Sequence, residues 1–106
     1  VTNSMRIAQE EAFGPAAPII AVDNEDAAIK VANDTEYGLG ASIWTEDLEK
    51  AEALAKKITA GLVFVNKGVR SDPRYPFGGA KKSGIGRELG RYGLLEMLNI
   101  KTIVIN

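Results

Sequence analysis

Apolar and polar positions alternate along this chain in blocks of two kinds. Four apolar runs have the length of strands and are too short for helices. They occupy residues 18–22, 40–44, 62–66 and 100–105. Between them, apolar residues recur at the spacing of one helix face over residues 25–33, from about 46 to 58, and over about 86–98. The pattern therefore predicts strands and helices in alternation.

Polar and glycine residues mark where the two best-defined helices begin and end. Asp23 or Asn24 precedes the first helix and can accept hydrogen bonds from its free amides. Thr45 is the predicted cap of the second helix, whose first turn is acidic, as the helix dipole favours. Gly61 follows its last turn, where glycine commonly ends a helix. Residues 67–83 form a long loop rich in proline and glycine, and loops of that size are usually functional or disordered.

The predicted order is strand, helix, strand, helix, strand, loop, helix, strand. Alternation at these spacings predicts an α/β fold with at least some parallel pairing, and 106 residues suit one domain. Residues 62–65 of the third predicted strand are apolar at successive positions, so both faces of that strand need cover. Three helices can scarcely provide it. We therefore expect further chain or a partner to complete the core.

Composition removes several classes of chemistry. The chain contains no cysteine and no histidine. It therefore has no disulfide, thiolate metal ligand or cysteine nucleophile, and it lacks the commonest general base and metal ligand. We predict no catalytic and no metal-binding residue of its own. No apolar run approaches the roughly 20 residues of a membrane span, and no secretory signal is recognisable, so we predict a cytoplasmic protein.

Charge is distributed unevenly, although the net charge is only −1. Residues 67–91 carry seven basic and two acidic side chains. With the aromatic rings of Tyr75, Phe77 and Tyr92, this segment could form an anion-binding or nucleic-acid-binding surface. The alternative is a solvated or interface surface. We favour the alternative, because the sequence contains no recognisable nucleic-acid-reading motif.

Two motifs near the chain's ends suggest ligand chemistry. Gly84, Gly86 and Gly90 form a GxGxxxG pattern related to the dinucleotide-binding fingerprint, but a Pro/Gly loop precedes it where the fingerprint needs a strand. A tight turn with close backbone approach is the favoured interpretation. EEAFGP at residues 10–15 places two carboxylates beside an aromatic ring and a turn. They could bind a ribose or serve as acid and base, although adjacent glutamates are more often solvated.

Four motifs stand in the same order and spacing as in one known family. They are EEAFGP (residues 10–15), ANDTEYGL (32–39), AGLVFVN (60–66) and PFGGAKKSGIGRE (76–88). Each resembles a segment of the NAD(P)-dependent aldehyde dehydrogenases, and the last matches the family pattern PFGGxKxSGxGRE at every specified position. The resemblance covers nearly the whole chain, but only the C-terminal portion of the family's longer one. It implies that residues 1–99 are part of the catalytic domain, and that residues 100–106 are a strand that joins a neighbouring subunit's sheet.

The resemblance also assigns roles to four residues. Glu11 matches the glutamate that binds the hydroxyls of the nicotinamide ribose, and Phe13 matches the aromatic residue packed against the nicotinamide. Phe77 matches an aromatic residue of the aldehyde tunnel. Residues 67–75 match the loop that tunes substrate choice, with a length similar to that of succinate-semialdehyde dehydrogenases. In those enzymes the serine that Ser71 matches binds the substrate carboxylate, but its neighbours here depart from their usual pattern.

Other parts of the family's machinery are missing from this chain. The family reaction uses a cysteine thiolate to attack the aldehyde, a glutamate-activated water to release the acid, and a Rossmann domain to hold the adenine half of NAD or NADP. We therefore expect a C-terminal fragment or split subunit, inactive alone, that works with an N-terminal dehydrogenase fragment. We also expect a homo-oligomer through the last strand. The alternative is a self-assembling structural or binding module, because unpaired strand edges join other chains.

Overall fold

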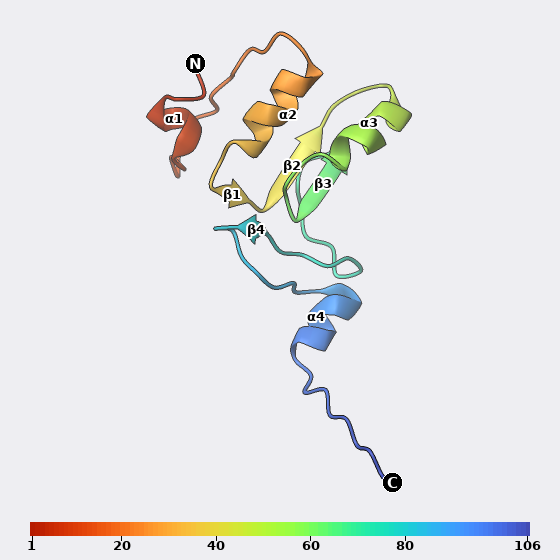
Figure 1. The fold of residues 1–106 in the computed structure, drawn as a ribbon. Coiled ribbons are helices and arrows are strands. Elements are labelled where there is room, and N and C mark those ends of the chain that lie inside the picture. The colour runs from red at the N-terminus through yellow and green to blue at the C-terminus, as the bar shows by residue number, and fades with distance from the viewer.

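The computed structural model describes residues 1–106 and contains four helices and four strands (Figure 1). The helices are α1 (Arg6–Gln9), α2 (Glu25–Asn33), α3 (Leu48–Ala55) and α4 (Gly90–Glu96). The strands are β1 (Tyr37–Gly38), β2 (Gly40–Ile43), β3 (Leu62–Val65) and β4 (Ala80–Lys81). Helices and strands alternate over the middle of the chain, which confirms the predicted α/β class.

The parallel pair β2–β3 is the centre of the fold. Gly40 pairs with Leu62 and Ile43 with Val65. Helix α3 makes the crossover connection that parallel strands require and lies beside β3 (Figure 1). Ala51 on α3 is 1% exposed and is the one buried apolar side chain of the chain. Both strands begin where the apolar runs predict and end one residue earlier.

A second, antiparallel pair links distant parts of the chain. Tyr37 of β1 pairs with Lys81 of β4, and Gly38 pairs with Ala80. The hydrophobic pattern indicates neither strand, because it predicts a turn near Tyr37 and a loop over residues 67–83. Two residues give too few alternating positions to be recognised in a sequence. These strands exist only because the two segments meet in the folded chain.

The first two predicted helices are present, but α3 is shorter than the predicted residues 46–58 and ends well before Gly61. Its cap differs as well. Asn24 Oδ1 accepts a hydrogen bond from the Ala27 amide at 2.9 Å and so caps α2. The predicted cap of α3, Thr45, is wrong: Asp47 Oδ1 accepts from the Lys50 amide at 2.9 Å instead. The Thr45 hydroxyl accepts from the Asp47 amide at 3.1 Å. Thr45 therefore supports the turn that leads into the helix.

Elements near the two ends of the chain differ from prediction. Residues 18–22 and 100–105 form no strand, because a strand needs a neighbouring strand with which to pair and neither run has one in the single chain. Helix α4 is shorter at its start than predicted, because Glu88 pairs with Phe77 and Leu89 takes a φ of 62°. The one-turn helix α1 has no signature in the hydrophobic pattern.

The chain has almost no core of its own. Four residues are buried, and three of them are glycines. The radius of gyration is 17.4 Å, against about 13 Å for a compact domain of this length. The C-terminal segment runs away from the other elements (Figure 1), and large apolar side chains such as Ile19, Ile85 and Ile105 are exposed. The helices thus leave the strands incompletely covered, as the sequence predicts.

Candidate functional site

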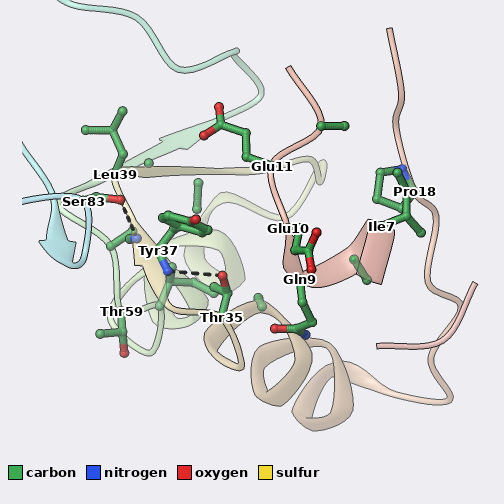
Figure 2. A pocket seen from close by; sticks show the side chains of 18 of the residues that line it. Ile7, Gln9, Glu10, Glu11, Pro18, Thr35, Tyr37, Leu39, Thr59 and Ser83 are labelled. Carbon is green, nitrogen blue, oxygen red and sulfur yellow. Dashed lines mark hydrogen bonds between the residues drawn. The ribbon is translucent and has the colours of Figure 1, made fainter. Parts of the chain in front are cut away.

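A hollow of about 500 Å³ lies between the N-terminal segment and the strands (Figure 2). Helix α1 and residues 10–18 supply one wall, and residues 35–41 with 58–60 supply the other. Ser83, from the turn after β4, adds to the second wall. A volume of this size suits a small ligand or one end of a cofactor.

The two adjacent glutamates at this hollow differ in their partners. Arg6 holds Glu10 by donating from Nε to Oε1 at 2.9 Å and from Nη2 to Oε2 at 2.7 Å. This pairing lowers the pKa of the Glu10 carboxyl and raises the pKa of Arg6. Glu11 has no hydrogen-bond or ion-pair partner, and its carboxylate stands apart from Glu10 in Figure 2. Glu11 is therefore the carboxylate left free to accept hydrogen bonds from a ligand.

Hydrogen bonds from backbone amides to side-chain hydroxyls fix the wall of the hollow around Tyr37. The Tyr37 amide donates to Thr35 Oγ1 at 3.2 Å, and the Gly38 amide donates to Ser83 Oγ at 3.0 Å (Figure 2). Taken one by one, Tyr37 and Ser83 have no feature in the sequence that marks them as site residues. Both lie inside motifs that resemble the dehydrogenases, ANDTEYGL and PFGGAKKSGIGRE. That resemblance is the signal that could have found them.

Phe13 does not line the hollow, although it follows Glu11 by two residues. Its side chain is 91% exposed, and its backbone has a φ of 47°, in the left-handed region. For a bulky residue this conformation costs on the order of 1–3 kcal/mol. The exposed ring is free to pack against a planar ligand. The structure thus places Glu11 at the hollow and Phe13 outside its lining.

Phe77 lies in a second, smaller hollow of about 140 Å³. Its lining combines apolar, basic and acidic side chains, including Phe64, Lys67, Arg70, Asp72 and Arg74. Arg74 donates to Asp72 from Nε at 2.9 Å and from Nη2 at 2.7 Å. This pair, with a smaller effect of Arg70, holds the pKa of the Asp72 carboxyl far below its usual range. Ser71 does not line this hollow, so the structure does not bring Ser71 and Phe77 together.

Most basic side chains of residues 67–91 bind within the chain. Lys81 Nζ donates to two carbonyl oxygens at the end of α2, at 2.7 and 3.0 Å. Lys82 forms an ion pair of 2.5 Å with a glutamate that follows α2, and Arg87 donates to a backbone carbonyl of its own turn at 2.7 Å. With the Arg74 pair, these contacts use four of the seven basic groups. The arrangement favours a structural role for this segment over nucleic-acid binding.

The glycine-rich segment forms a closed turn. Phe77 and Glu88 exchange two backbone hydrogen bonds of 2.7 Å across its base. A β-carbon on Gly79 would lie 2.5 Å from that of Ser83, so glycine is needed there for close approach. Helix α4 begins at Gly90, the last glycine of the pattern, whereas the dinucleotide fingerprint opens a helix at its first glycines. The tight-turn interpretation is therefore confirmed.

No cluster of three or more side chains of the types that bind metals is present. None of the four helices has the length and apolar character needed to span a bilayer.

The fold and the hollows together define an incomplete α/β unit. The main hollow has one free carboxylate, Glu11, which suits a ligand that carries hydroxyl groups. Comparison with known proteins identifies the family to which this unit belongs. The model of the family described as "Aldehyde dehydrogenase family" matches residues 1–103. The chain belongs to the aldehyde dehydrogenase family.

Several relatives show how much of that family the chain represents. A probable NADP(+) succinate-semialdehyde dehydrogenase of Synechocystis sp. is 54% identical over 92% of this chain and 21% of that protein. Aldehyde dehydrogenase 1A1 of Gallus gallus is 49% identical over 99% and 21%. The structure of betaine aldehyde dehydrogenase from Staphylococcus aureus with NAD+ has a TM-score of 0.87 and 44% identity, over 91% of this chain and 19% of that one. The chain spans about a fifth of the length of these relatives.

Proposed function

We propose that this chain takes part in the NAD(P)-dependent oxidation of aldehydes to carboxylic acids, with residues 1–99 as part of a catalytic domain. The observation that carries the proposal is the free carboxylate of Glu11 at the main hollow, in a chain of the aldehyde dehydrogenase family. Its neighbour Glu10 is already bound by Arg6. The chain contains no cysteine, so the nucleophile of the reaction comes from outside these residues.

The residues at the main hollow fit the nicotinamide end of NAD or NADP. A carboxylate without partners can accept hydrogen bonds from two adjacent ribose hydroxyls, which is the role we propose for Glu11. Phe13 would pack its exposed ring against the nicotinamide side of the cofactor. When bound, the dinucleotide supplies the acceptor for the hydride that leaves the aldehyde. The solved betaine aldehyde dehydrogenase contains NAD+, which supports this choice of cofactor.

We further propose that the second hollow and the adjacent loop receive the aldehyde. Phe77 offers an apolar surface there, and Lys67 and Arg70 have no ion-pair partner. This combination suits an aldehyde with a negatively charged end, to which Ser71 would donate a hydrogen bond from the loop. The name of the Synechocystis relative, a probable succinate-semialdehyde dehydrogenase, supports an acidic aldehyde.

The complete aldehyde dehydrogenase that we propose to contain these residues is called the enzyme that carries this chain. Replacing Glu11 by Gln in it is expected to raise the KM for NAD(P) about ten- to a hundredfold. Hydrogen bonds to a charged acceptor contribute about 1.5–3 kcal/mol, and the amide keeps the shape but loses the charge. Steady-state rates at saturating aldehyde and varied cofactor measure the change. The matched control is Glu46→Gln, which removes an exposed carboxylate that lines neither of the two hollows. An unaltered KM in Glu11→Gln would contradict the assignment.

We also propose that residues 100–106 join the sheet of a second copy of this chain. This C-terminal arm is extended and apolar, and Ile100, Ile103 and Ile105 are 84%, 75% and 90% exposed. Its backbone makes no hydrogen bond to any other segment. An unpaired, extended apolar segment of this kind is a ready template for pairing with the sheet of another chain.

Deleting residues 100–106 is therefore expected to convert an oligomer into monomers. Light scattering coupled to size exclusion measures the mass of the enzyme with and without the arm. Asn106→Lys is the matched control, because it changes the end of the arm and keeps every apolar side chain. An unchanged oligomer after the deletion would show that assembly uses another surface.

A further inference from the structure

Asn66 closes the parallel β2–β3 pair with its side chain. The last backbone pair is Ile43 with Val65, and the Asn66 amide still donates to the Ile43 carbonyl at 2.8 Å. At the next position of the pair, the Asn66 side chain takes the place of a backbone partner and bonds to the backbone of Thr45. Thr45 N donates to Asn66 Oδ1 at 2.9 Å, and Asn66 Nδ2 donates to the Thr45 carbonyl at 2.7 Å.

This replacement lets the main chain leave the sheet at Asn66. The backbone there has a φ of 53°, a conformation that asparagine tolerates better than most residues with a β-carbon. A strand that continued straight would pair its backbone with Thr45. Because the side-chain amide provides that pairing, the chain can turn outward into residues 67–75 without giving up the hydrogen bonds.

Three other contacts hold the same loop further along. A β-carbon on Gly40 would lie 2.7 Å from the Val69 side chain, so Val69 packs directly on the start of β2. The Tyr75 amide donates to the Asp72 carbonyl at 3.0 Å, and the Gly90 amide donates to the Pro73 carbonyl at 3.1 Å. The loop is thus fixed at its middle and at its far end. The Asn66 side chain is the corresponding support at its beginning.

We propose that Asn66 is a positioning residue, whose amide sets the path of residues 67–71 and thereby the place of Lys67, Arg70 and Ser71 relative to the second hollow. The inference rests on the proposed function, in which these side chains meet the charged end of the aldehyde. Asn66 itself lines neither hollow. Its effect on the substrate therefore passes through the loop.

Three substitutions separate the parts of this role in the enzyme that carries the chain. Asn66→Ala removes both side-chain hydrogen bonds and disfavours the left-handed backbone. Asn66→Gly permits that backbone and still removes both bonds. Asn66→Asp keeps an acceptor for the Thr45 amide and loses the donor to the Thr45 carbonyl. Asn24→Ala is the matched control, because Asn24 caps α2 with a side-chain oxygen and lies outside both hollows.

We expect Asn66→Ala and Asn66→Gly to raise the KM for an acidic aldehyde about tenfold, since small displacements of binding groups have effects of this size or larger. The KM for NAD(P) should stay within about twofold, and Asn66→Asp should lie between wild type and alanine. Asn24→Ala should change neither KM. If Asn66→Gly kept the wild-type KM, the backbone conformation alone would matter and the proposal would be overturned. The proposal would also be overturned if Asn66→Ala and Asn24→Ala lowered Tm to the same extent and neither changed the KM for the acidic aldehyde.

A second measurement does not depend on catalysis. Hydrogen–deuterium exchange of residues 67–71, read by mass spectrometry, should become at least about fivefold faster in Asn66→Ala and stay unchanged in Asn24→Ala. Unchanged exchange in Asn66→Ala would overturn the positioning role. A wild-type enzyme that oxidised no aldehyde would instead contradict the proposed function, and the exchange result would then decide whether Asn66 positions the loop.

Discussion

An alanine at position 61 is expected to destabilise the protein by about 3 kcal/mol or more, at the upper end of the range for overpacked sites. Gly61 leads into β3, and its amide donates to the Gly38 carbonyl at 2.9 Å. A β-carbon on Gly61 would overlap the carbonyl oxygen of Gly78 and lie 2.7 Å from the carbonyl carbon. Backbone atoms cannot rotate away as the end of a flexible side chain can. The glycine-rich turn and the start of β3 would therefore have to separate.

Urea unfolding followed by circular dichroism measures this change in the enzyme that carries the chain. Gly68→Ala is the matched control, because it adds the same methyl group where a β-carbon would meet no atom within 4 Å. Its free energy of unfolding should stay within about 0.5 kcal/mol of wild type, as for most surface substitutions. Equal urea midpoints for the two alanine variants would show that the Gly78 carbonyl does not lie as close to Gly61 as in this structure.

Local signals explain which elements could be predicted from the sequence. Helix α2 has a capping asparagine, an acidic first turn and an apolar stripe within nine residues, and it spans the predicted residues 25–33. Strand β3 is a contiguous apolar run and β2 a short, mainly apolar one, and the two lie on either side of a helix. In each case the information lies within one segment, so a hydrophobic pattern is sufficient to find it.

The elements that could not be predicted depend on partners far away in the chain. Tyr37 and Lys81 pair although they lie 44 positions apart in the sequence, and nothing near either residue marks it as a strand. The opposite error occurs at residues 18–22 and 100–105. Those runs have the apolar character of strands, but the single chain offers them no edge with which to pair. A strand is a property of two segments, whereas a sequence pattern describes one.

The candidate site shows the same limit at the level of side chains. Local chemistry treats Glu10 and Glu11 as equals, because both are adjacent carboxylates before a Gly-Pro turn. The structure distinguishes them through Arg6, which stands one helical turn before Glu10 and binds it. Only the family resemblance singled out Glu11 in advance. Tyr37 and Ser83 meet at the hollow through the β1–β4 pairing, which no local pattern indicates.

Purified by itself, the 106-residue chain is expected to oxidise aldehydes at least about 10⁴-fold more slowly than the enzyme that carries it. Loss of a nucleophile and its general base has effects of this order or larger in enzymes that form covalent intermediates. The chain has no cysteine and no histidine, and Glu11 would hold the cofactor without attacking the carbonyl. Formation of reduced nicotinamide, followed by its absorbance, measures the rate with an acidic aldehyde and NAD or NADP.

Adding an N-terminal chain that carries the cysteine and the dinucleotide-binding domain is expected to restore turnover. The physical reason is that the 106-residue chain exposes large apolar side chains and has Ala51 as its one buried apolar side chain, so association can cover surface that the chain cannot cover alone. Binding of a dye that recognises exposed apolar surface should fall in step with the return of activity. An N-terminal chain with the cysteine replaced by serine should reduce dye binding equally and restore no turnover. Turnover by the 106-residue chain alone would refute the proposal that the nucleophile lies outside this chain, because the attacking group would then have to lie within these residues.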